Sequence, residues 1–336
     1  MAENVISLIS PPLKPKRKIC FLLIGHVHLM DLAGPSQVFY EASSIGELGY
    51  ESVYCSTQKE ITSEQGVVFA RLTLLNEITL SKGDFIFVPG IDFKSFCAGD
   101  LTAQIREITP WLKRQAAAGV QIASVCSGSL VLAEAGLLDG KRCTSHWKCI
   151  DYMKSHYPRV TVLTDRLYVQ DGSFFTSAGM TSGIDMSLSI IEQHHGPVLA
   201  AKVAREIVVY LRRNNYDSQQ TIYLDYRTHF NPAVHKVQDY IISNPGKNPG
   251  LEELAAISNT SVRSLTRLFK KSTGHTIIEF KNAVKVELAG RLVHNADFTL
   301  EKIASLCGFE SARHFRRIWN QHKGTSLKAF REMAES

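Results

Sequence analysis

One unit occurs twice in the C-terminal third of the chain, and this repeat restricts the possible folds more than any other feature. The segment 251–255 (LEELA) recurs as 300–304 (LEKIA), 49 residues later. In each copy a second segment follows that is basic and has apolar residues at the spacing of one helix face. A short helix, a turn and a second helix form a helix-turn-helix, and two such units can place two helices in successive major grooves. The repeat therefore predicts a helical domain that binds double-stranded DNA.

The net charge of the chain lies in the same region as the repeat. The formal charge is +6, from 38 lysines and arginines against 32 aspartates and glutamates. Residues 228–336 hold 16 of the basic and 10 of the acidic side chains, so residues 1–227 are neutral overall. A solvated basic helix face is the alternative explanation, but the basic residues recur at the same place in both copies. This recurrence favours a surface that meets a polyanion.

The second helix of each unit, here called a reading helix, carries the candidates for DNA contact. In both reading helices an apolar stripe at i, i+3 and i+4 faces the core and turns the polar side chains outward. Arginine can hold guanine O6 and N7 with two hydrogen bonds, whereas lysine more often meets phosphate. The base-contact candidates are Arg263, Arg267, Arg313 and Arg317. The further DNA-contact candidates are Thr266, Lys270, Lys271, His314 and Arg316. A predicted linker helix over 277–295 holds the reading helices about one DNA turn, ~34 Å, apart.

Composition argues against several classes of protein. No apolar run approaches the ~18 residues of a membrane span. The cysteines are seven, an odd number, and no two form a Cys-x-x-Cys pair, which argues against a disulfide framework or a zinc site. The pair His194-His195 is not expected to bind a metal, because adjacent helical residues point about 100° apart. We therefore expect a protein of the reducing cytoplasm with no membrane segment, no metal and no cofactor.

Short apolar segments alternate with helical segments in the first two thirds of the chain. Near-continuous apolar residues occur over 19–25, 52–56, 84–90 and 120–125, and helical spacing occurs over 32–46 and 101–118. This alternation is typical of a parallel sheet covered by helices on both faces. The expected fold is a parallel-sheet α/β sandwich followed by an all-α double helix-turn-helix domain. The expected boundaries are a flexible arm over 1–17, the α/β domain over 18–216, a linker over 217–231 and the DNA-binding domain over 232–336.

The junction 123–130 (ASVCSGSL) is the most informative point of the predicted sheet. It joins a strand to a helix through small residues, as a nucleophile on a tight turn requires. A helix N-terminus after Cys126 would lower the pKa of its thiol and offer backbone N–H groups to an oxyanion. A buried structural cysteine is the alternative, and it is the commonest state of a free thiol. The residues favour the elbow geometry and leave catalysis open.

Several segments resemble known families. The stretch ASVCSGSLVLAEAGLLDGKRCTSHW at 123–147, with HLMDLAGP at 28–35 and TSAGMTSGIDMSL at 176–188, is similar to the ThiJ/PfpI group, which has the class I glutamine-amidotransferase-like fold. The segments LFKKSTG at 268–274 and GFESARHFRRIWNQHKGTS at 308–326 resemble the AraC/XylS DNA-binding domain. Together they match the GlxA-type subset of AraC regulators. The resemblance implies an α/β domain that senses a small molecule.

The chain departs from the ThiJ/PfpI pattern at the elbow. The hydrolytic members place His directly after the cysteine, and Ser127 stands there, so the usual general base is missing. Asp31 fits an Asp that faces the cysteine in the isonitrile-hydratase branch, although a helix N-cap explains it equally well. His146, beside a Trp, is better explained as a structural group than as a pocket acid or base. The ligand-binding candidates are Asp31, Cys126, Ser127, Gly128, His146 and Thr181, and the catalytic candidates among them are Cys126 and Asp31.

The second domain departs from its family at three positions. The proline that usually follows the Ser/Thr after each repeat glycine is replaced by Ile277 in the first copy and by Leu327 in the second. Because proline at a first helical position only pre-sets a favoured geometry, we expect its loss to cost little. The family arginine near the start of the linker helix is replaced by Lys285.

Three functions are compatible with these residues. The leading hypothesis is a sequence-specific transcriptional regulator, expected to be a homodimeric activator that meets RNA polymerase, although the residues do not separate activation from repression. By resemblance alone, its effector is expected to be an amino-acid-like or quaternary-ammonium metabolite. The alternatives are a lyase or hydratase of the isonitrile-hydratase type that uses Cys126 and Asp31, and a thiol redox sensor based on Cys126.

Overall fold

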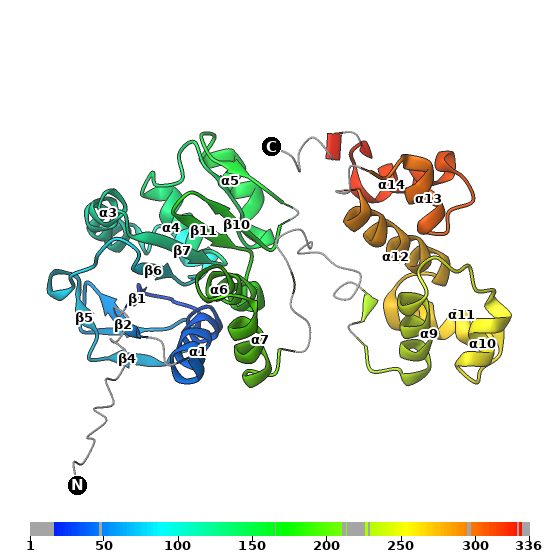
Figure 1. The fold of residues 1–336 in the computed structure, drawn as a ribbon, viewed down its shortest axis with the longest axis horizontal. Coiled ribbons are helices and arrows are strands. Elements are labelled where there is room, and N and C mark those ends of the chain that lie inside the picture. Colours follow the sequence, from blue (N-terminus) through cyan, green and yellow to red (C-terminus); the bar gives the residue numbers. More distant parts are fainter. Residues whose placement is uncertain are drawn as a thin grey trace, which may run out of the picture. The chain divides into compact units, whose positions relative to one another are not determined.

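The computed structural model describes residues 17–46, 49–164, 166–209, 213, 226–227, 229–293, 297–327 and 329–330. The chain divides into two compact units, Met1–Gln219 and Gln220–Ser336. Nearly all of the predicted arm (1–17) and most of the predicted linker (217–231) lie outside the described residues. Each unit is described by itself below (Figure 1).

The first unit is built on a seven-stranded sheet with the strand order β10-β11-β7-β6-β1-β2-β5. All neighbouring pairs are parallel except β10 and β11, which are antiparallel. The strands are β1 (Arg17–Leu22), β2 (Tyr50–Ser56), β5 (Thr73–Leu74), β6 (Phe85–Val88), β7 (Gln121–Val125), β10 (Tyr168–Asp171) and β11 (Phe174–Ser177). Two small ladders lie beside it, β3 (Glu60–Thr62) with β4 (Val68–Ala70) and β8 (Arg142–Cys143) with β9 (Thr161–Val162).

Helices cover both faces of this sheet, which confirms the predicted α/β sandwich (Figure 1). The helices of one face are α1 (Leu29–Gly46), α6 (Met180–His195) and α7 (Pro197–Glu206). Those of the other face are α2 (Phe93–Ala98), α3 (Thr102–Ala117), α4 (Gly128–Glu134) and α5 (Ile150–His156), and two 3-10 turns, Leu75–Glu77 and Trp147–Cys149, complete the unit. The last four residues of β1, 19–22, are apolar and buried because successive side chains face opposite cores: Phe21 points into one core and Leu22 into the other.

The second unit is helical and contains the repeat. Its helices are α9 (Pro232–Ser243), α10 (Leu251–Ile257), α11 (Val262–Thr273), α12 (Ile277–Leu292), α13 (Leu300–Leu306) and α14 (Ala312–Lys323). The reading helices begin at equivalent serines, because Ser261 and Ser311 each accept a hydrogen bond from the backbone N–H three residues on. They also end at equivalent glycines, Gly274 and Gly324, which have φ of 78° and 65°. The two copies thus use the same local chemistry at both helix ends.

Helix α12 lacks the family proline at its first residue, and a side-chain capping box stabilises the start of the helix instead. Thr276 and Glu279 form a capping box, in which each side chain bonds the backbone N–H of the other residue. Ile277, in the proline position, is buried in the core of the first helix-turn-helix. These contacts explain why replacing the family proline is expected to cost little stability.

Helix α12 joins two separate apolar cores of the second unit (Figure 1). Its first half, with Phe280 and Val284, packs against α9, α10 and α11. Its second half, with Val286 and Ala289, packs against α13 and α14 around Trp319. The single helix therefore belongs to both helix-turn-helix units. Among the described helices, none is long and apolar enough to cross a membrane.

Candidate functional site

The reading helices α11 and α14 expose their basic side chains on the side opposite their cores. Leu265 and Phe269 of α11 are buried, as are Phe315, Ile318 and Trp319 of α14. The exposed basic residues are Arg263, Arg267, Lys270 and Lys271 on α11 and Arg313, Arg316 and Arg317 on α14. Within the described part of the chain, none of them forms an ion pair. Phe269 and Trp319 are fully buried and belong to the two cores rather than to the DNA-facing surface.

Two of the predicted DNA-contact residues differ in their surroundings from the arginines. His314 was expected to be exposed, but it is half-buried, and its ring meets Phe309 edge-on at 5.7 Å. The apolar side chain before the reading helix therefore covers part of it. Thr266 is exposed, but its hydroxyl donates a hydrogen bond of 2.6 Å to the Val262 carbonyl of its own helix. Only its acceptor capacity is left for a partner.

A buried lysine ties the two helix-turn-helix units together. Lys285 of α12 is 6% exposed, and its ammonium group donates to the Asn248 side chain and, at 2.6 Å, to the Gly308 carbonyl. The Asn248 amide itself donates to the same carbonyl at 3.0 Å. Asn248 precedes α10 and Gly308 precedes α14, so one side chain contacts both units. The sequence showed Lys285 as a family departure and gave no sign of this contact.

In the first unit, Cys126 forms the predicted elbow between β7 and α4. It has a φ of 58°, a conformation that a non-glycine residue rarely adopts, and it is 4% exposed. Gly128 allows the turn, because a Cβ there would lie only 2.2 Å from the Val88 carbonyl oxygen. The glycine is needed for close packing against the loop after β6, and this explains it without a ligand.

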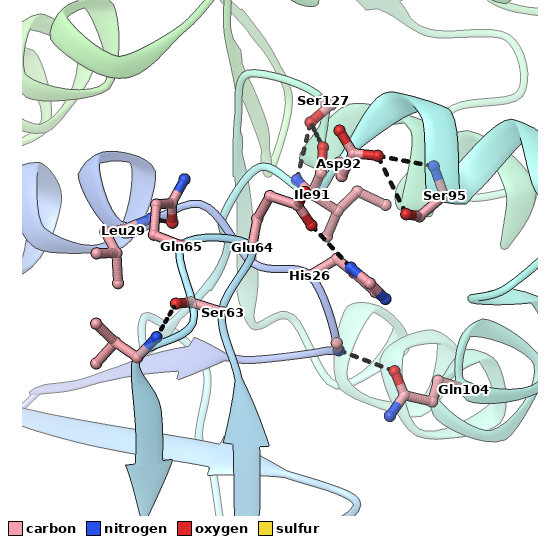
Figure 2. Close-up of polar contacts among 12 residues, drawn as sticks. His26, Leu29, Ser63, Glu64, Gln65, Ile91, Asp92, Ser95, Gln104 and Ser127 are labelled. Carbon is pink, nitrogen blue, oxygen red and sulfur yellow. Dashed lines mark hydrogen bonds and ion pairs between the residues drawn. The ribbon is translucent and has the colours of Figure 1, made fainter.

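Hydroxyl groups around the elbow are used to hold the loops (Figure 2). The Ser127 hydroxyl accepts from the Ile91 N–H at 2.8 Å and donates to the Ile91 carbonyl at 2.6 Å. Ser129 and Ser145, which the sequence analysis did not single out, both donate to the Cys126 carbonyl at 3.2 Å. Ser127 thus fixes the loop after β6 and takes no place among the groups that face the thiol.

Asp31 lies against the Cys126 thiol, together with a histidine that the sequence analysis missed. Helix α1 begins at Leu29, so Asp31 is its third residue, and the side chain is not an N-cap. Both carboxylate oxygens are buried, and neither has a hydrogen bond of good geometry among the described residues, although one lies 3.3 Å from His28 Nδ1. The nearest ligand atoms of His28, Asp31 and Cys126 all lie within 4.8 Å of one another. Gly90 leaves room for them, because a Cβ there would lie 2.1 Å from Asp31 Oδ2.

The electrostatics of the elbow differ from the expectation. Burial, and secondly the charge of Asp31, raise the pKa of the Cys126 thiol well above its ordinary value. The expected lowering by the helix N-terminus is therefore wrong, because desolvation of a thiolate and a neighbouring carboxylate outweigh it. The same carboxylate raises the pKa of His28 against the opposing effect of burial. Cys126 is thus a protonated thiol at neutral pH, which weakens both the nucleophile and the redox-sensor hypotheses.

The remaining candidates lie at the edge of the elbow or have other partners. His146 caps the turn Trp147–Cys149, where its Nδ1 accepts from the Lys148 N–H at 3.4 Å, and burial lowers its pKa. Its structural interpretation is therefore supported. Thr181 is exposed on α6, and its hydroxyl accepts a hydrogen bond of 2.8 Å from Arg213.

The adjacent histidines of α6 have separate partners. His194 Nδ1 bonds the Arg17 guanidinium, and His195 Nε2 bonds the Tyr50 hydroxyl, each at 2.8 Å. Burial lowers the pKa of His194 to about 4. The two rings therefore serve different contacts, as the angle between neighbouring helical side chains led us to expect.

Comparison with known proteins now adds to this geometry. Residues 17–193 match the model of the DJ-1/PfpI family, and residues 254–333 match a helix-turn-helix domain model. The chain is 29% identical over 329 residues to the HTH-type transcriptional regulator GbdR of Pseudomonas aeruginosa, covering 94% of this chain and 84% of that protein. It is 35% identical to the regulator CdhR of the same species, over 71% of this chain and 69% of that one.

The chain belongs to the AraC-type transcriptional regulators that carry a DJ-1/PfpI domain. The regulator therefore binds DNA through its helix-turn-helix region. The chain is also 33% identical over 176 residues to the isonitrile hydratase of Pseudomonas putida, covering 52% of this chain and 71% of that enzyme. The likeness to the regulator GbdR extends over 94% of this chain, whereas the likeness to the enzyme covers about half of it.

Reactivity of the thiol separates a regulator from an enzyme or an oxidation sensor. We expect iodoacetamide to modify Cys126 at least about 10-fold more slowly at pH 7 than the exposed Cys97, because Cys126 is buried and protonated. The rate should rise only as the pH passes well above 8.5, roughly the pKa of a free thiol. Peptide mass spectrometry of the full chain follows both sites in one sample, so Cys97 is an internal control. Fast modification of Cys126 at neutral pH would favour a nucleophile or sensor.

Proposed function

We propose that this chain is a ligand-responsive regulator that recognises a two-part operator with α11 and α14. The observation that carries this proposal is the pair of equivalent basic helices joined by α12 and Lys285 within one compact unit. Arg267 and Arg317, which lie at equivalent places and form no ion pair with any described residue, are the groups we propose for base recognition. Lys270, Lys271 and Arg316 are proposed to meet phosphates, and Arg263 and Arg313 to contact bases near the start of each reading helix.

We propose that the DJ-1/PfpI domain senses a small metabolite at the elbow. Asp31 and Cys126 face each other there, and His146 lies close enough for the charge of Asp31 to act on its pKa. Ser127 and Gly128 are proposed to shape the floor of the site, and Thr181 its rim. An amino-acid-like or quaternary-ammonium effector remains the proposed class. Binding can alter DNA recognition only if the effector favours one arrangement of the protein over another.

We keep catalysis of the isonitrile-hydratase type as a second candidate function, because Cys126 and Asp31 are adjacent and the first unit is similar to such an enzyme. The raised pKa of the thiol is the observation against it. The alkylation measurement above decides between the two.

We also propose that the regulator is a homodimer in the cytoplasm that activates transcription by contact with RNA polymerase. Support for self-association is a depression of about 810 Å³ between α1 and strands β2, β4 and β5. Exposed apolar side chains lie on these elements, among them Tyr40 and Val68. Sedimentation equilibrium of the full chain tests the dimer, and a monomer at micromolar concentration would contradict it.

The experiment that tests the proposed function is selection of genomic DNA fragments by the purified full chain at about 150 mM salt. We expect enrichment of a shared motif with two parts about one helical turn apart. The double variant Arg267→Ala/Arg317→Ala should lose the motif, whereas Arg205→Ala, an exposed arginine of α7, should keep it. Enrichment without a motif, or with a motif that the double variant retains, would contradict the proposal.

A further inference from the structure

Three different metal-binding side chains meet at the elbow. His28 lies directly before α1, Asp31 in its first turn, and Cys126 at the end of β7. They offer a nitrogen, a carboxylate oxygen and a sulfur, and these atoms all lie within 4.8 Å of one another. Imidazole, carboxylate and thiolate are the ligand types that Zn²⁺ takes in proteins. No metal was expected from the sequence, because no two cysteines form a Cys-x-x-Cys pair and the adjacent His194 and His195 point apart; His28 was not considered.

Asp31 is the member of this cluster that most needs a positively charged partner. Its side chain is fully buried, and neither oxygen has a hydrogen bond of good geometry to any residue that the structure describes. A buried charge without compensation is costly, and buried carboxylates are normally paired or bound to a metal. Within the described residues, the only ion-pair partner of Asp31 is His28, which is neutral unless protonated. Gly90, on the facing loop, leaves open the space next to Asp31 Oδ2.

The geometry of the cluster suits a small tetrahedral ion. Zn–N and Zn–O bonds of about 2.0–2.1 Å at a tetrahedral angle place the two atoms about 3.3 Å apart. The observed separation of His28 Nδ1 and Asp31 Oδ2 is 3.3 Å. A Zn–S bond of about 2.3 Å requires the sulfur to be about 3.6 Å from both atoms. The three atoms lie within 4.8 Å of one another, so side-chain shifts of up to about 1.2 Å bring them to three corners of a tetrahedron and leave the fourth corner open. The His28 N–H donates to the Gly90 carbonyl at 2.8 Å, which holds the loop before α1 against the loop after β6. The hydrogen bonds between Ser127 and Ile91 hold the elbow against the same loop (Figure 2).

We propose that His28, Asp31 and Cys126 form a binding site for a zinc-like divalent cation. On binding, the Cys126 S–H bond breaks, its proton passes to solvent, and the thiolate forms the metal–sulfur bond while neutral His28 donates through Nδ1. The two negative ligands then balance the two positive charges of the ion, which removes the repulsion between a thiolate and Asp31. Sulfur and nitrogen ligands favour Zn²⁺ or Co²⁺ over Mg²⁺ and Ca²⁺. The site lies in the proposed effector pocket, but it does not depend on how the second unit reads DNA.

The probe for this site is Co²⁺, added without oxygen to full-length protein that has been stripped with a chelator. We expect one Co²⁺ per chain, a thiolate-to-cobalt charge-transfer band, and displacement by an equivalent of Zn²⁺. Cys126→Ser should abolish the band, because it removes the sulfur ligand. Asp31→Asn and His28→Gln should weaken binding at least about tenfold, as loss of even an outer-shell partner costs 10- to 100-fold.

Matched controls separate this site from other thiols and from folding defects. Cys97→Ser removes an exposed cysteine and should leave the band unchanged. His28 is partly exposed, with a side-chain exposure of 24%, so His28→Gln is the variant most certain to fold, and circular dichroism checks each protein. Absence of the band in the wild type, or its persistence in Cys126→Ser, would overturn the proposal. So would unchanged affinity in both Asp31→Asn and His28→Gln.

DNA binding is measured separately on the metal-free and the metal-loaded protein. A regulator that selects its motif but binds no Co²⁺ disproves the metal site and leaves the proposed function intact. A protein that binds Co²⁺ through Cys126 but selects no motif supports the metal site and contradicts the proposed function. The two proposals can therefore fail independently.

Discussion

Replacing Arg267 or Arg317 with alanine should weaken operator binding by about 1–3 kcal/mol, or roughly 5- to 150-fold, for each substitution. Each arginine is exposed on a reading helix and forms no ion pair among the described residues, so its guanidinium is available for a guanine. The two reading helices pack against separate cores, so the losses of binding free energy should add in the double variant. Fluorescence anisotropy with the selected operator, and with single-base variants of it, measures the affinity.

The base preference distinguishes base contacts from phosphate contacts. Arg267→Ala should relax discrimination at one base of one half-site, and Arg317→Ala at the equivalent base of the other. Lys270→Ala should instead weaken binding to all sequences alike and reduce the slope of log affinity against log salt by about one. Arg205→Ala, in the first unit, should change neither. If Arg267→Ala and Lys270→Ala gave the same uniform loss, the assignment of Arg267 to a base would be wrong.

Lys285→Met should destabilise the second unit by about 2–4 kcal/mol. The two hydrogen bonds from its charged group contribute about 3–6 kcal/mol together, and removing the desolvation cost of the buried ammonium group offsets part of that loss. The Gly308 carbonyl keeps only its bond from Asn248. Loss of the shared contact should also loosen one helix-turn-helix from the other. We therefore expect a larger loss of affinity for the complete operator than for either half-site. Hydrogen exchange over 244–250 and 300–323 should rise together.

Lys281→Met is the matched control for this effect. Lys281 is also on α12 and partly buried, but its ammonium group donates to the Pro249 carbonyl, which belongs to the first helix-turn-helix. Its loss should affect the first helix-turn-helix and leave the hydrogen exchange of 300–323, in the second helix-turn-helix, unchanged. Lys285→Arg, which restores the residue expected from the family resemblance, should recover operator binding in part or in full. If Lys285→Met and Lys281→Met gave the same hydrogen exchange and the same operator affinity, Lys285 would not couple the two helix-turn-helix units.

Local patterns predicted the helix-turn-helix units well. Helices α10 and α13 begin at the first residues of the repeated segments 251–255 and 300–304, and the reading helices follow them with equivalent serine caps at Ser261 and Ser311. These features depend on helix periodicity and on hydrogen bonds between residues three or four apart, so the order of residues is enough to predict them. The exposure of His314 was overestimated, because Phe309, which covers part of its ring, lies before the helix and outside the helical pattern.

The elbow was predicted only in part, for a different reason. Small residues around Cys126 indicated a tight turn, and the structure has it. The sequence predicted a lowered pKa for the Cys126 thiol, whereas the structure raises it. The two causes, burial of Cys126 and the nearness of Asp31, arise from packing of segments that are distant in the chain. His28 stood three residues before Asp31 in the segment that carried the family resemblance, and this spacing was the one signal that could have pointed to it.

The sequence by itself determined the class of the fold, the doubled helix-turn-helix, the basic faces and the family, because each depends on periodicity, composition or local motifs. The tertiary structure decided which side chains meet. It placed His28, Asp31 and Cys126 together at the carboxyl ends of parallel strands, and it placed Lys285 between Asn248 and Gly308. Such contacts join residues far apart in the chain, and their protonation and partners depend on burial, which no local pattern specifies.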